Sequence, residues 1–575
     1  MKWQGKGVSE GLAMAQIHLF TPKLPEISRQ PAADAEAEVA KLEATLAAAE
    51  EELRGLYETA KEKMGEQEAE IFDAHLTILG DEYSVREPII QRIREQKQNA
   101  AAAITDQFDE LAQMFRSLGD ELMAERAADA EDLKQQLLRI CLGCGRQDLS
   151  VLPGDVIVLA EELTPSDTVR MDTAHVKGIA TRLGGATAHS AIIARTLGIP
   201  AAAGIDGWQT EALNGHMAIL DGADGTLTVD PTDDETACYQ SRKAQADCEA
   251  QALEAFRTCP SQTKDGISLE ICANIGTPQE AQQAMKYGAD GVGLFRSEFL
   301  FMDRTAMPTE EEQFEAYKKV AIALNGKPVI IRTLDIGGDK EIPYMGLEKD
   351  ENPFLGYRAI RLCLDRKEDI YKPQLRALLR ASAYGNIRIM IPLVTCIDEL
   401  REAKALIEEI KAELDEKNIA YKKDIQVGIM VETAAASLIA DIFAKEADFF
   451  SIGTNDLTQY TMSVDRGNKK VSYLYSTFNP AVLRSIRHII ACGREAGIMV
   501  GMCGEAASDP MMIPLLLAFG LNEFSMSASA ILRARKMVTE YSVEELQAVA
   551  DKAMSFATTA EVEDYMRKFV EKITG

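Results

Sequence analysis

The carboxyl-terminal half of the chain repeats one pattern: a short apolar run, a loop and a helical stretch. The pattern begins near Ser261, continues to the end of the chain, and contains eight apolar runs suited to buried strands. Eight strand–helix units in succession predict a (β/α)₈ TIM barrel, whose active site would lie at the carboxyl ends of the strands. A doubly wound sheet is the alternative, but the glycine-rich dinucleotide loop typical of that fold is missing. The eight runs are Ser268–Asn274, Gly291–Arg296, Pro328–Leu334, Ile387–Val394, Gln426–Glu432, Asp448–Ile452, Ile498–Cys503 and Glu523–Met526.

Charged and amide side chains follow several of these runs, at the positions where the strands would end. Purely structural charges would scatter over the outer faces of the helices instead. Two arginines suit a phosphate and a carboxylate, because a guanidinium can bind each through two parallel hydrogen bonds. Two carboxylates suit Mg²⁺, which prefers a few protein oxygens together with substrate oxygens. The residues predicted to converge on this rim are Arg296, Arg332, Glu432, Asn455, Asp456 and Cys503.

The amino-terminal half combines two kinds of sequence. Residues 31–146 are rich in Ala, Glu, Leu and Lys, and their apolar residues recur at helical spacing, which predicts a bundle of helical hairpins. The flanking residues 1–30 and 147–230 contain short runs of Gly, Val and Ile typical of an α/β domain. We therefore expect a multidomain α/β protein in which one α/β domain is interrupted by an all-helical subdomain.

A polar, Ala-rich segment follows the α/β domain. Thr232 and Glu235 have the spacing of a capping box, which predicts the start of a helix. We expect residues 231–260 to form a linker helix that leads into the barrel of residues 261–575.

One histidine has a distinctive setting. Gly184 and Gly185 follow a predicted strand at Val176–Thr181, and His189 falls in the first turn of a helix that ends near Gly198. Free backbone N–H groups and the positive end of the helix dipole favour an anion there. A neutral imidazole at this position could accept a phosphoryl group. The alternative is a histidine that only packs at the start of a helix, and the spacing alone leaves both open.

The composition excludes several classes of protein. Lys and Arg total 62 against 91 Asp and Glu, so the net charge is −29 and the basic footprint of a nucleic-acid-binding protein is missing. No apolar run approaches the ~20 residues of a membrane helix, and no signal-peptide core follows the start. The 10 cysteines lack a framework spacing, which indicates reduced thiols. We expect a cytoplasmic protein that neither binds nucleic acid nor inserts into a membrane.

Several segments resemble the phosphoenolpyruvate-utilising enzymes. Gly184–Ser190 is similar to the phosphohistidine signature of that family, and Asp448–Tyr460 is similar to its second signature. Further matching segments are Gly293–Glu298, Arg332–Lys340 and Asn352–Arg358. The order and spacing of these blocks, over essentially the whole chain, resemble the Enzyme I family of the bacterial sugar phosphotransferase system.

The resemblance implies that phosphoenolpyruvate phosphorylates His189 with release of pyruvate, and that His189 passes the phosphoryl group to a histidine of the phosphocarrier protein HPr. It also implies that the α/β domain swivels, that the helical subdomain docks HPr, and that the barrel forms a homodimer. Glu432 and Asp456 would hold Mg²⁺, and Cys503 would protonate the enolate carbon. The residues implied to bind or orient phosphoenolpyruvate are Arg296, Arg332, Arg358, Asn455, Asp456 and Arg466.

Two other interpretations compete with this one. Phosphoenolpyruvate synthase and pyruvate phosphate dikinase share the histidine domain and the barrel, but both need an ATP-binding domain in front. The segment before His189 is short and contains no candidate nucleotide loop. A regulator that binds carrier proteins without catalysis would have a degenerate site, whereas every expected site residue is present.

Overall fold

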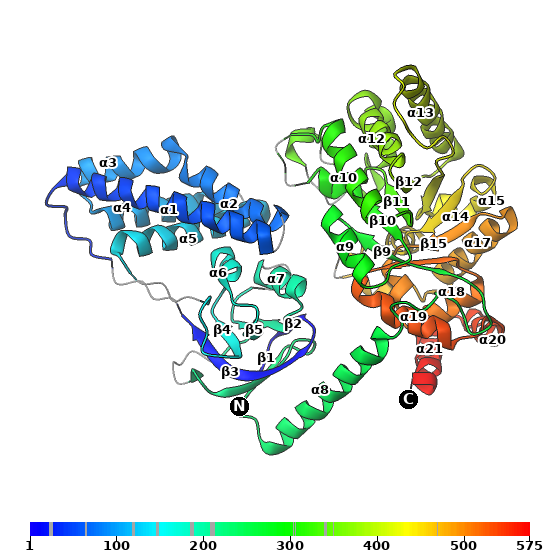
Figure 1. Cartoon of the computed structure of the whole chain (residues 1–575), viewed down its shortest axis with the longest axis horizontal. Helices are drawn as coiled ribbons and strands as arrows, with labels where there is room; N and C mark the ends of the chain where they lie inside the picture. The colour runs from blue at the N-terminus through cyan, green and yellow to red at the C-terminus, as the bar shows by residue number, and fades with distance from the viewer. Residues whose placement is uncertain are drawn as a thin grey trace. The chain divides into compact units, whose positions relative to one another are not determined.

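The computed structural model describes residues 1–21, 27–63, 66–117, 121–144, 149–184, 189–207, 213–302, 304, 306–337, 342–348, 350–468 and 470–574. The chain folds into two compact units, Met1–Asp247 and Cys248–Gly575 (Figure 1). The finer domain boundaries at residues 30, 146, 230 and 260 stay a prediction. Within the described ranges, no helix combines the length and the apolar character needed to cross a membrane.

A mixed eight-stranded sheet forms the base of the first unit. Its strands lie in the order β1-β8-β7-β3-β4-β5-β6-β2; neighbours from β3 to β6 are parallel and the other neighbouring pairs are antiparallel. Successive side chains of a strand point to opposite faces, so Val158 and Leu159 of β4 belong to separate buried clusters. The strands are β1 (Lys2–Gln4), β2 (Lys6–Ser9), β3 (Leu12–Phe20), β4 (Val156–Ala160), β5 (Val176–Thr181), β6 (Ala201–Ala203), β7 (Met217–Asp221) and β8 (Thr226–Val229).

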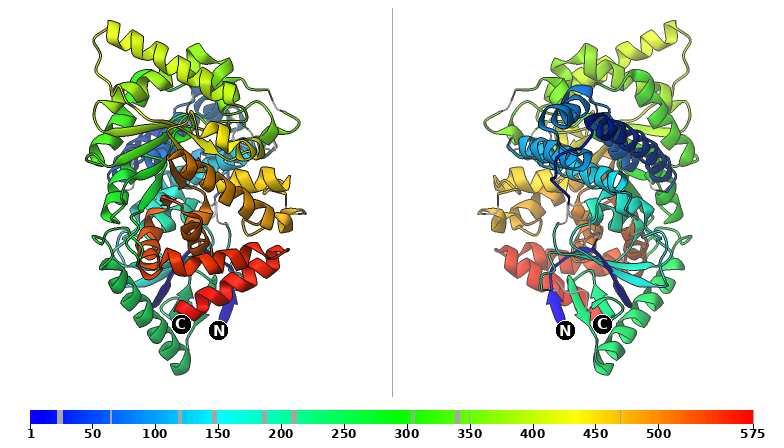
Figure 2. Two further views of the ribbon diagram at one scale, coloured as in Figure 1. Left: turned by 90° about the vertical axis from the view of Figure 1, so that its right-hand side faces the viewer. Right: turned by 90° about the vertical axis from the view of Figure 1, so that its left-hand side faces the viewer.

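A helical bundle is inserted between β3 and β4, as the sequence predicts. Its long helices pack in pairs, α1 with α2 and α4 with α5 (Figures 1 and 2). Leu42, Ala49 and Leu53 of α1 are fully buried in the bundle, in agreement with their helical spacing. The helices are α1 (Ala35–Lys63), α2 (Glu66–Leu79), α3 (Glu87–Gln96), α4 (Ala100–Ser117) and α5 (Glu121–Leu142), with a single-turn π-helix (Glu82–Arg86) before α3.

The predicted capping box opens the long helix α8. The Thr232 backbone N–H donates to Glu235 Oε2 at 2.8 Å, and the Glu235 N–H donates to Thr232 Oγ1 at 3.3 Å. These two bonds satisfy N–H groups that the first helical turn leaves without partners. The remaining helices of this half are α6 (Pro165–Arg170), α7 (His189–Leu197) and α8 (Asp233–Glu254), and the boundary between the two units lies inside α8.

The second unit is a closed barrel of eight parallel strands, which confirms the predicted fold. Each strand from β9 to β16 pairs with the next, and β16 closes the barrel onto β9. Every strand overlaps one of the predicted apolar runs. The strands are β9 (Glu270–Ile275), β10 (Val292–Arg296), β11 (Pro328–Arg332), β12 (Asn386–Ile391), β13 (Val427–Val431), β14 (Phe449–Ile452), β15 (Met499–Met502) and β16 (Glu523–Met526).

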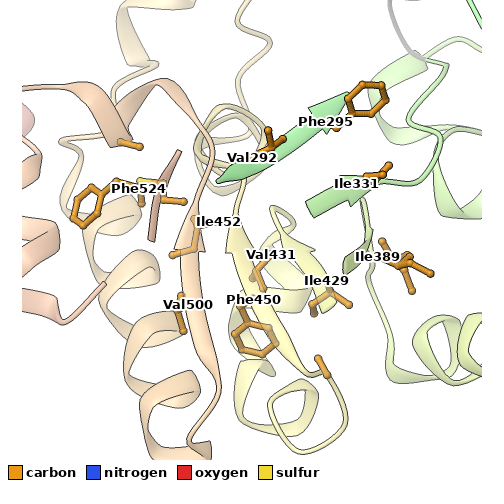
Figure 3. Close-up of a cluster of buried hydrophobic side chains, with 14 of the residues drawn as sticks. Val292, Phe295, Ile331, Ile389, Ile429, Val431, Phe450, Ile452, Val500 and Phe524 are labelled. Atoms are coloured by element: carbon orange, nitrogen blue, oxygen red, sulfur yellow. The ribbon is translucent and has the colours of Figure 1, made fainter. Parts of the chain in front are cut away.

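Apolar side chains fill both sides of the barrel wall. Val292, Ile331 and their neighbours on successive strands belong to the large cluster shown in Figure 3. A smaller cluster that includes Leu294, Met430 and Phe449 packs inside the barrel, so the barrel is a filled core rather than a pore. Helices follow the strands around the barrel (Figures 1 and 2). They are α9 (Pro278–Lys286), α10 (Glu310–Ala323), α11 (Ile360–Asp365), α12 (Lys372–Ser382), α13 (Ile397–Glu416), α14 (Ala434–Leu438), α15 (Ala440–Phe443), α16 (Thr454–Met462), α17 (Pro480–Ala496), α18 (Ile513–Phe519), α19 (Ile531–Glu540), α20 (Val543–Met554) and α21 (Thr559–Thr574).

A buried arginine ties the segment after α8 to the barrel. Arg535 of α19 is 1% exposed. Its guanidinium donates to the Phe256 and Arg257 carbonyls, both at 3.2 Å. It also donates to the Gly288 carbonyl at 2.6 Å and to Ser261 Oγ at 2.9 Å. Asp290 Oδ2 lies 3.2 Å from Arg535 Nη2 and supplies the counter-charge. Together these partners offset the cost of burying the charge, so the segment after α8 is part of the barrel's own packing.

Candidate active site

The carboxyl ends of neighbouring strands bring the predicted rim residues to one level of the barrel. Arg296 of β10 and Arg332 of β11 are register partners. The last residues of β13, β14 and β15 are also in register. The residues that follow them, Glu432, Gly453 and Cys503, therefore lie next to one another at the strand ends.

The surroundings of Glu432 are built to hold its carboxyl group. A Cβ on Gly453 would lie 2.6 Å from Glu432 Oε2, so glycine is needed to leave room. Glu432 Oε1 accepts a hydrogen bond from the Leu393 N–H at 2.7 Å. Leu393 has a φ of 55°, a strained value for a residue with a side chain, and this conformation presents its N–H to Glu432.

Asp335 links the two buried arginines of the site. Its Oδ2 accepts from Arg332 Nη1 at 2.7 Å and its Oδ1 accepts from Arg358 Nη2 at 2.8 Å. Arg332 also pairs with Glu298 at 2.5 Å, and Arg358 lies 3.4 Å from Asp456. Burial disfavours the charge of each guanidinium, but Asp335 and the other carboxylates outweigh it and raise the pKa of both arginines. Both arginines are therefore held in place and charged.

Glu432 stands in a cluster of acidic groups. Burial raises its pKa, the negative charges of Asp456 and Asp335 add to this effect, and the positive charges of Arg332 and Arg358 partly oppose it. Asp456 lies in the first turn of α16 and is also buried. Arg466 Nη1 is 4.0 Å from Asp456 Oδ1. A divalent cation would relieve the repulsion among these carboxylates, so the oxygens present suit such an ion.

Cys503 is buried at the top of the cluster that fills the barrel. Burial raises the pKa of its thiol to about 11, so the thiol is protonated at neutral pH. The Cys503 N–H donates to the Ile452 carbonyl at 3.2 Å. Its own carbonyl accepts from Asn274 Nδ2 at 3.0 Å. The residue thus combines an available proton with a fixed main chain.

The other predicted rim residues are more accessible. Arg296 and Arg466 are exposed, and Asn455 is half-buried, with its carbonyl accepting from the Tyr475 hydroxyl at 3.2 Å. A cavity of about 250 Å³ opens next to Thr433, the residue that follows Glu432. Residues that line it include Phe354, Leu393, Thr433 and Tyr460.

Sequence reasoning did not single out four residues of this network: Glu298, Asp335, Asn274 and Tyr460. Tyr460 accepts from Arg358 Nη1 at 3.3 Å and donates to the Phe354 carbonyl at 2.5 Å. Asp335 carried a signal, because an acid three residues after a strand-end arginine can turn back onto it. Asn274 ends the first predicted strand and Tyr460 ends the matching segment Asp448–Tyr460, but neither was assigned a role, since their partners lie far away in the sequence.

His189 is the first residue of α7, as predicted, and α7 ends at Leu197 before Gly198. The preceding strand β5 also has its predicted bounds. The segment Gly185–Ala188 and the His189 side chain lie outside the described residues, and so do Gly338–Lys340 of the matching block. The histidine belongs to the first compact unit and the rim residues belong to the second.

Comparisons with known proteins agree with this division. Three family models match the chain: "PEP-utilising enzyme, N-terminal" over residues 4–126, "PEP-utilising enzyme, mobile domain" over residues 152–225, and "PEP-utilising enzyme, PEP-binding domain" over residues 250–543. The last of these spans the barrel and its rim.

Curated relatives match the chain almost from end to end. It is 46% identical over 565 residues to the "Phosphoenolpyruvate-protein phosphotransferase" of Geobacillus stearothermophilus, which covers 98% of this chain and 97% of the relative. It is 45% identical over 569 residues to the protein of that name from Staphylococcus aureus, which covers 99% of each chain. The relative from Staphylococcus carnosus is 44% identical over 568 residues and covers 99% of each chain. The chain therefore belongs to the phosphoenolpyruvate-utilising enzymes, within the group of phosphoenolpyruvate-protein phosphotransferases.

Proposed function

We propose that this protein transfers the phosphoryl group of phosphoenolpyruvate to its own His189, releases pyruvate, and passes the group on to a histidine of HPr. This would be the first step of sugar uptake through the phosphotransferase system. The observation that carries the proposal is the convergence of two buried, charged arginines, a carboxylate cluster and a protonated thiol at one end of the barrel. Membership in the family supports it.

The arginines would bind the substrate. Arg332 and Arg358 are buried and charged, which suits the phosphate and carboxylate groups of phosphoenolpyruvate. Arg296, Asn455 and Arg466 at the accessible side of the rim would complete the set. Phosphoryl transfer depends mainly on positioning and on stabilisation of charge, and these groups supply both.

Glu432 and Asp456 would hold Mg²⁺. An uncompensated carboxylate at Glu432 is costly, because the group is buried beside other acids, and a bound cation would remove that cost. Mg²⁺ commonly takes one or two protein carboxylates together with phosphate oxygens, and it would neutralise charge on the transferred group. In the part of the chain that the structure describes, no group of three or more His, Cys, Asp or Glu could hold a metal. The proposed site therefore depends on substrate oxygens.

Cys503 would complete the reaction at carbon. When the bond between phosphorus and the enol oxygen breaks, the phosphoryl group goes to His189 and the enolate of pyruvate is left. The Cys503 thiol would then donate its proton to the methylene carbon, which becomes the methyl group of pyruvate. The resulting thiolate regains a proton from water, and the enzyme returns to its starting state once His189 has passed its phosphoryl group to HPr.

The family also supports proposals about partners. We infer that the helical subdomain docks HPr, that the α/β domain swivels between the barrel and the carrier, and that the barrel forms a homodimer in the cytoplasm. A net charge of −29 suits a carrier with a basic docking surface.

Incubation with ³²P-labelled phosphoenolpyruvate and Mg²⁺, without ATP, tests the proposal. The wild-type protein should acquire an acid-labile label, His189→Ala should acquire none, and EDTA should suppress labelling. His175→Ala is the matched control, since His175 is an exposed histidine of the same unit and should label normally. Wild-type labelling of His189→Ala would refute the proposal. A requirement for ATP would favour the synthase and dikinase alternative, and undiminished labelling in EDTA would exclude the metal.

A further inference from the structure

Asn274 makes three directed contacts at the carboxyl end of β9, of which the longest runs from its Nδ2 to the Ser525 carbonyl at 3.4 Å. Its Nδ2 donates to the Cys503 carbonyl at 3.0 Å, and its Oδ1 accepts from Ser525 Oγ at 2.7 Å. Ser525 is fully buried in β16. Because an amide oxygen only accepts and an amide nitrogen only donates, these contacts together fix the direction of the Asn274 side chain.

These contacts hold the chain at Cys503 from a second side. β9 pairs with β16, and β16 pairs with β15, so Asn274 reaches past one strand to the residue that follows β15. On the other side, the Cys503 N–H donates to the Ile452 carbonyl at 3.2 Å, and Cys503 Sγ lies 3.9 Å from that carbonyl oxygen. The main chain of Cys503 is therefore fixed at both its N–H and its carbonyl.

The hydrogen bonds from Asn274 and to Ile452, which together hold the Cys503 main chain and are called the clamp below, would serve the proposed proton transfer. Cys503 is the first residue after β15, where a strand gives way to a connection, and connections are the mobile parts of a fold. Proton transfer to a carbon atom demands a set distance and direction, and a shift of about 1 Å in a reacting group can cost about 100-fold in rate. An amide that is itself held by a buried hydroxyl removes that freedom.

We propose that Asn274, held by Ser525, is a positioning residue that keeps the Cys503 thiol in line with the methylene carbon of the substrate. This inference rests on the proposed function, in which Cys503 is the proton donor. Asn274 acts through the main chain of Cys503 and needs no contact with the substrate.

A double-mutant cycle on the full-length protein tests the inference. Pyruvate formation and phosphoenolpyruvate binding are measured for Asn274→Ala, Cys503→Ser and the double variant. Asn274→Ala should lower kcat about 10-fold and leave KM and Kd near wild type, because the hydrogen bond that holds the Cys503 carbonyl is lost and no substrate contact is removed. In the Cys503→Ser background the same change should have no further effect, because residues that act through one group do not add.

Two more variants make the result specific to the clamp. Asn274→Asp keeps the acceptor for Ser525 but loses the donor to Cys503, so it should behave like Asn274→Ala. Asn386→Ala is the matched control: Asn386 is also half-buried, lies at the opposite end of the barrel on β12, and its Oδ1 accepts from Lys422 Nζ at 3.3 Å. It should leave kcat unchanged. Circular dichroism checks that all variants are folded.

The outcomes separate two kinds of failure. If the effects of Asn274→Ala and Cys503→Ser multiply, or if Asn274→Ala raises KM and Kd without lowering kcat, Asn274 acts apart from the thiol and the inference is wrong. Such a result would leave the proposed function intact. Wild-type turnover by Cys503→Ser would overturn both, since the thiol would then not be the proton donor.

Discussion

Asp335 determines the placement of both buried arginines. Its two carboxylate oxygens each accept from one guanidinium, at 2.7 and 2.8 Å. Arg332 and Arg358 come from different segments, β11 and the loop before α11, so a single side chain aligns two parts of the rim. Removal of one partner from a buried ionic network leaves the remaining charges unbalanced and free to adopt other directions.

We expect Asp335→Asn to raise the KM for phosphoenolpyruvate about 10- to 100-fold, with a smaller effect on kcat. Hydrogen bonds to charged groups contribute about 1.5–3 kcal/mol each, and the variant weakens two of them. Steady-state kinetics of pyruvate formation is the measurement. Asp369→Asn is the control, because Asp369 pairs with Arg366 on the exposed surface. An unchanged KM would show that the arginines keep their positions without Asp335.

Glycines on two barrel strands leave room for the buried carboxyl group of Glu523. Glu523 at the start of β16 is fully buried. A Cβ on Gly293 of β10 or on Gly501 of β15 would lie 2.1 or 2.0 Å from one of its carboxyl oxygens. Burial raises the pKa of Glu523 to about 8, and the charge of Glu270 adds to this. β15, which pairs with β16, and β10, which lies beyond β9, therefore carry glycine where a mostly uncharged carboxyl group is buried.

This arrangement predicts a pH dependence of stability. The folded state holds the Glu523 proton up to about pH 8, whereas the unfolded chain releases it near the ordinary glutamate pKa of 4.5. Between these values the folded state binds more protons, so the barrel loses stability as pH rises from about 4.5 to about 8. Glu523→Gln should abolish this component: its thermal midpoint relative to wild type should rise across that window and level off outside it. The exposed Glu416→Gln is the control, and parallel curves for wild type and Glu523→Gln would contradict the prediction.

Elements were predictable from local sequence, but many contacts of the site were not. All eight barrel strands coincide with short apolar runs. The glycine pair that follows a predicted strand likewise indicated that a helix begins near His189. Such signals depend only on neighbours in the chain. By contrast, Asn274 meets Cys503 across 229 residues and Ser525 across 251. Only closure of the barrel brings them together, so no local pattern reports them.

Strained connections were equally hidden from the sequence. Arg358 was assigned by resemblance alone, and in the structure it is followed by Ala359, which has a φ of 53°. Leu393, which donates to Glu432, has a φ of 55°. Neither alanine nor leucine favours a positive φ. The surrounding packing imposes this conformation, and local sequence preference therefore does not reveal it.

At the scale of the whole molecule, the boundary between the two units lies inside α8, after Asp247. The two units have separate buried clusters, so each is expected to fold by itself. A fragment Cys248–Gly575 should therefore keep a folded barrel that binds phosphoenolpyruvate but accepts no phosphoryl group, because it lacks His189. The stability of such a fragment should depend on its first residue, because residues before Ser261 contact the buried Arg535.

A fragment that begins at Ser261 would carry a new positive α-amino group beside the buried guanidinium, whose Phe256 and Arg257 carbonyl partners would be gone. We expect it to be less stable than Cys248–Gly575 by about 3 kcal/mol, because Arg535 loses two hydrogen bonds and the single carboxylate of Asp290, 3.2 Å from Arg535 Nη2, then faces two positive charges. A fragment that begins at Ala255 keeps both carbonyls and should melt with the longer one. Because an α-amino group loses its proton near pH 8, the deficit of the Ser261 fragment should shrink as the pH is raised to about 9.5. Thermal melts of the three fragments at neutral pH and at about pH 9.5 would show whether the charge of a chain terminus can destabilise a buried cation beside it.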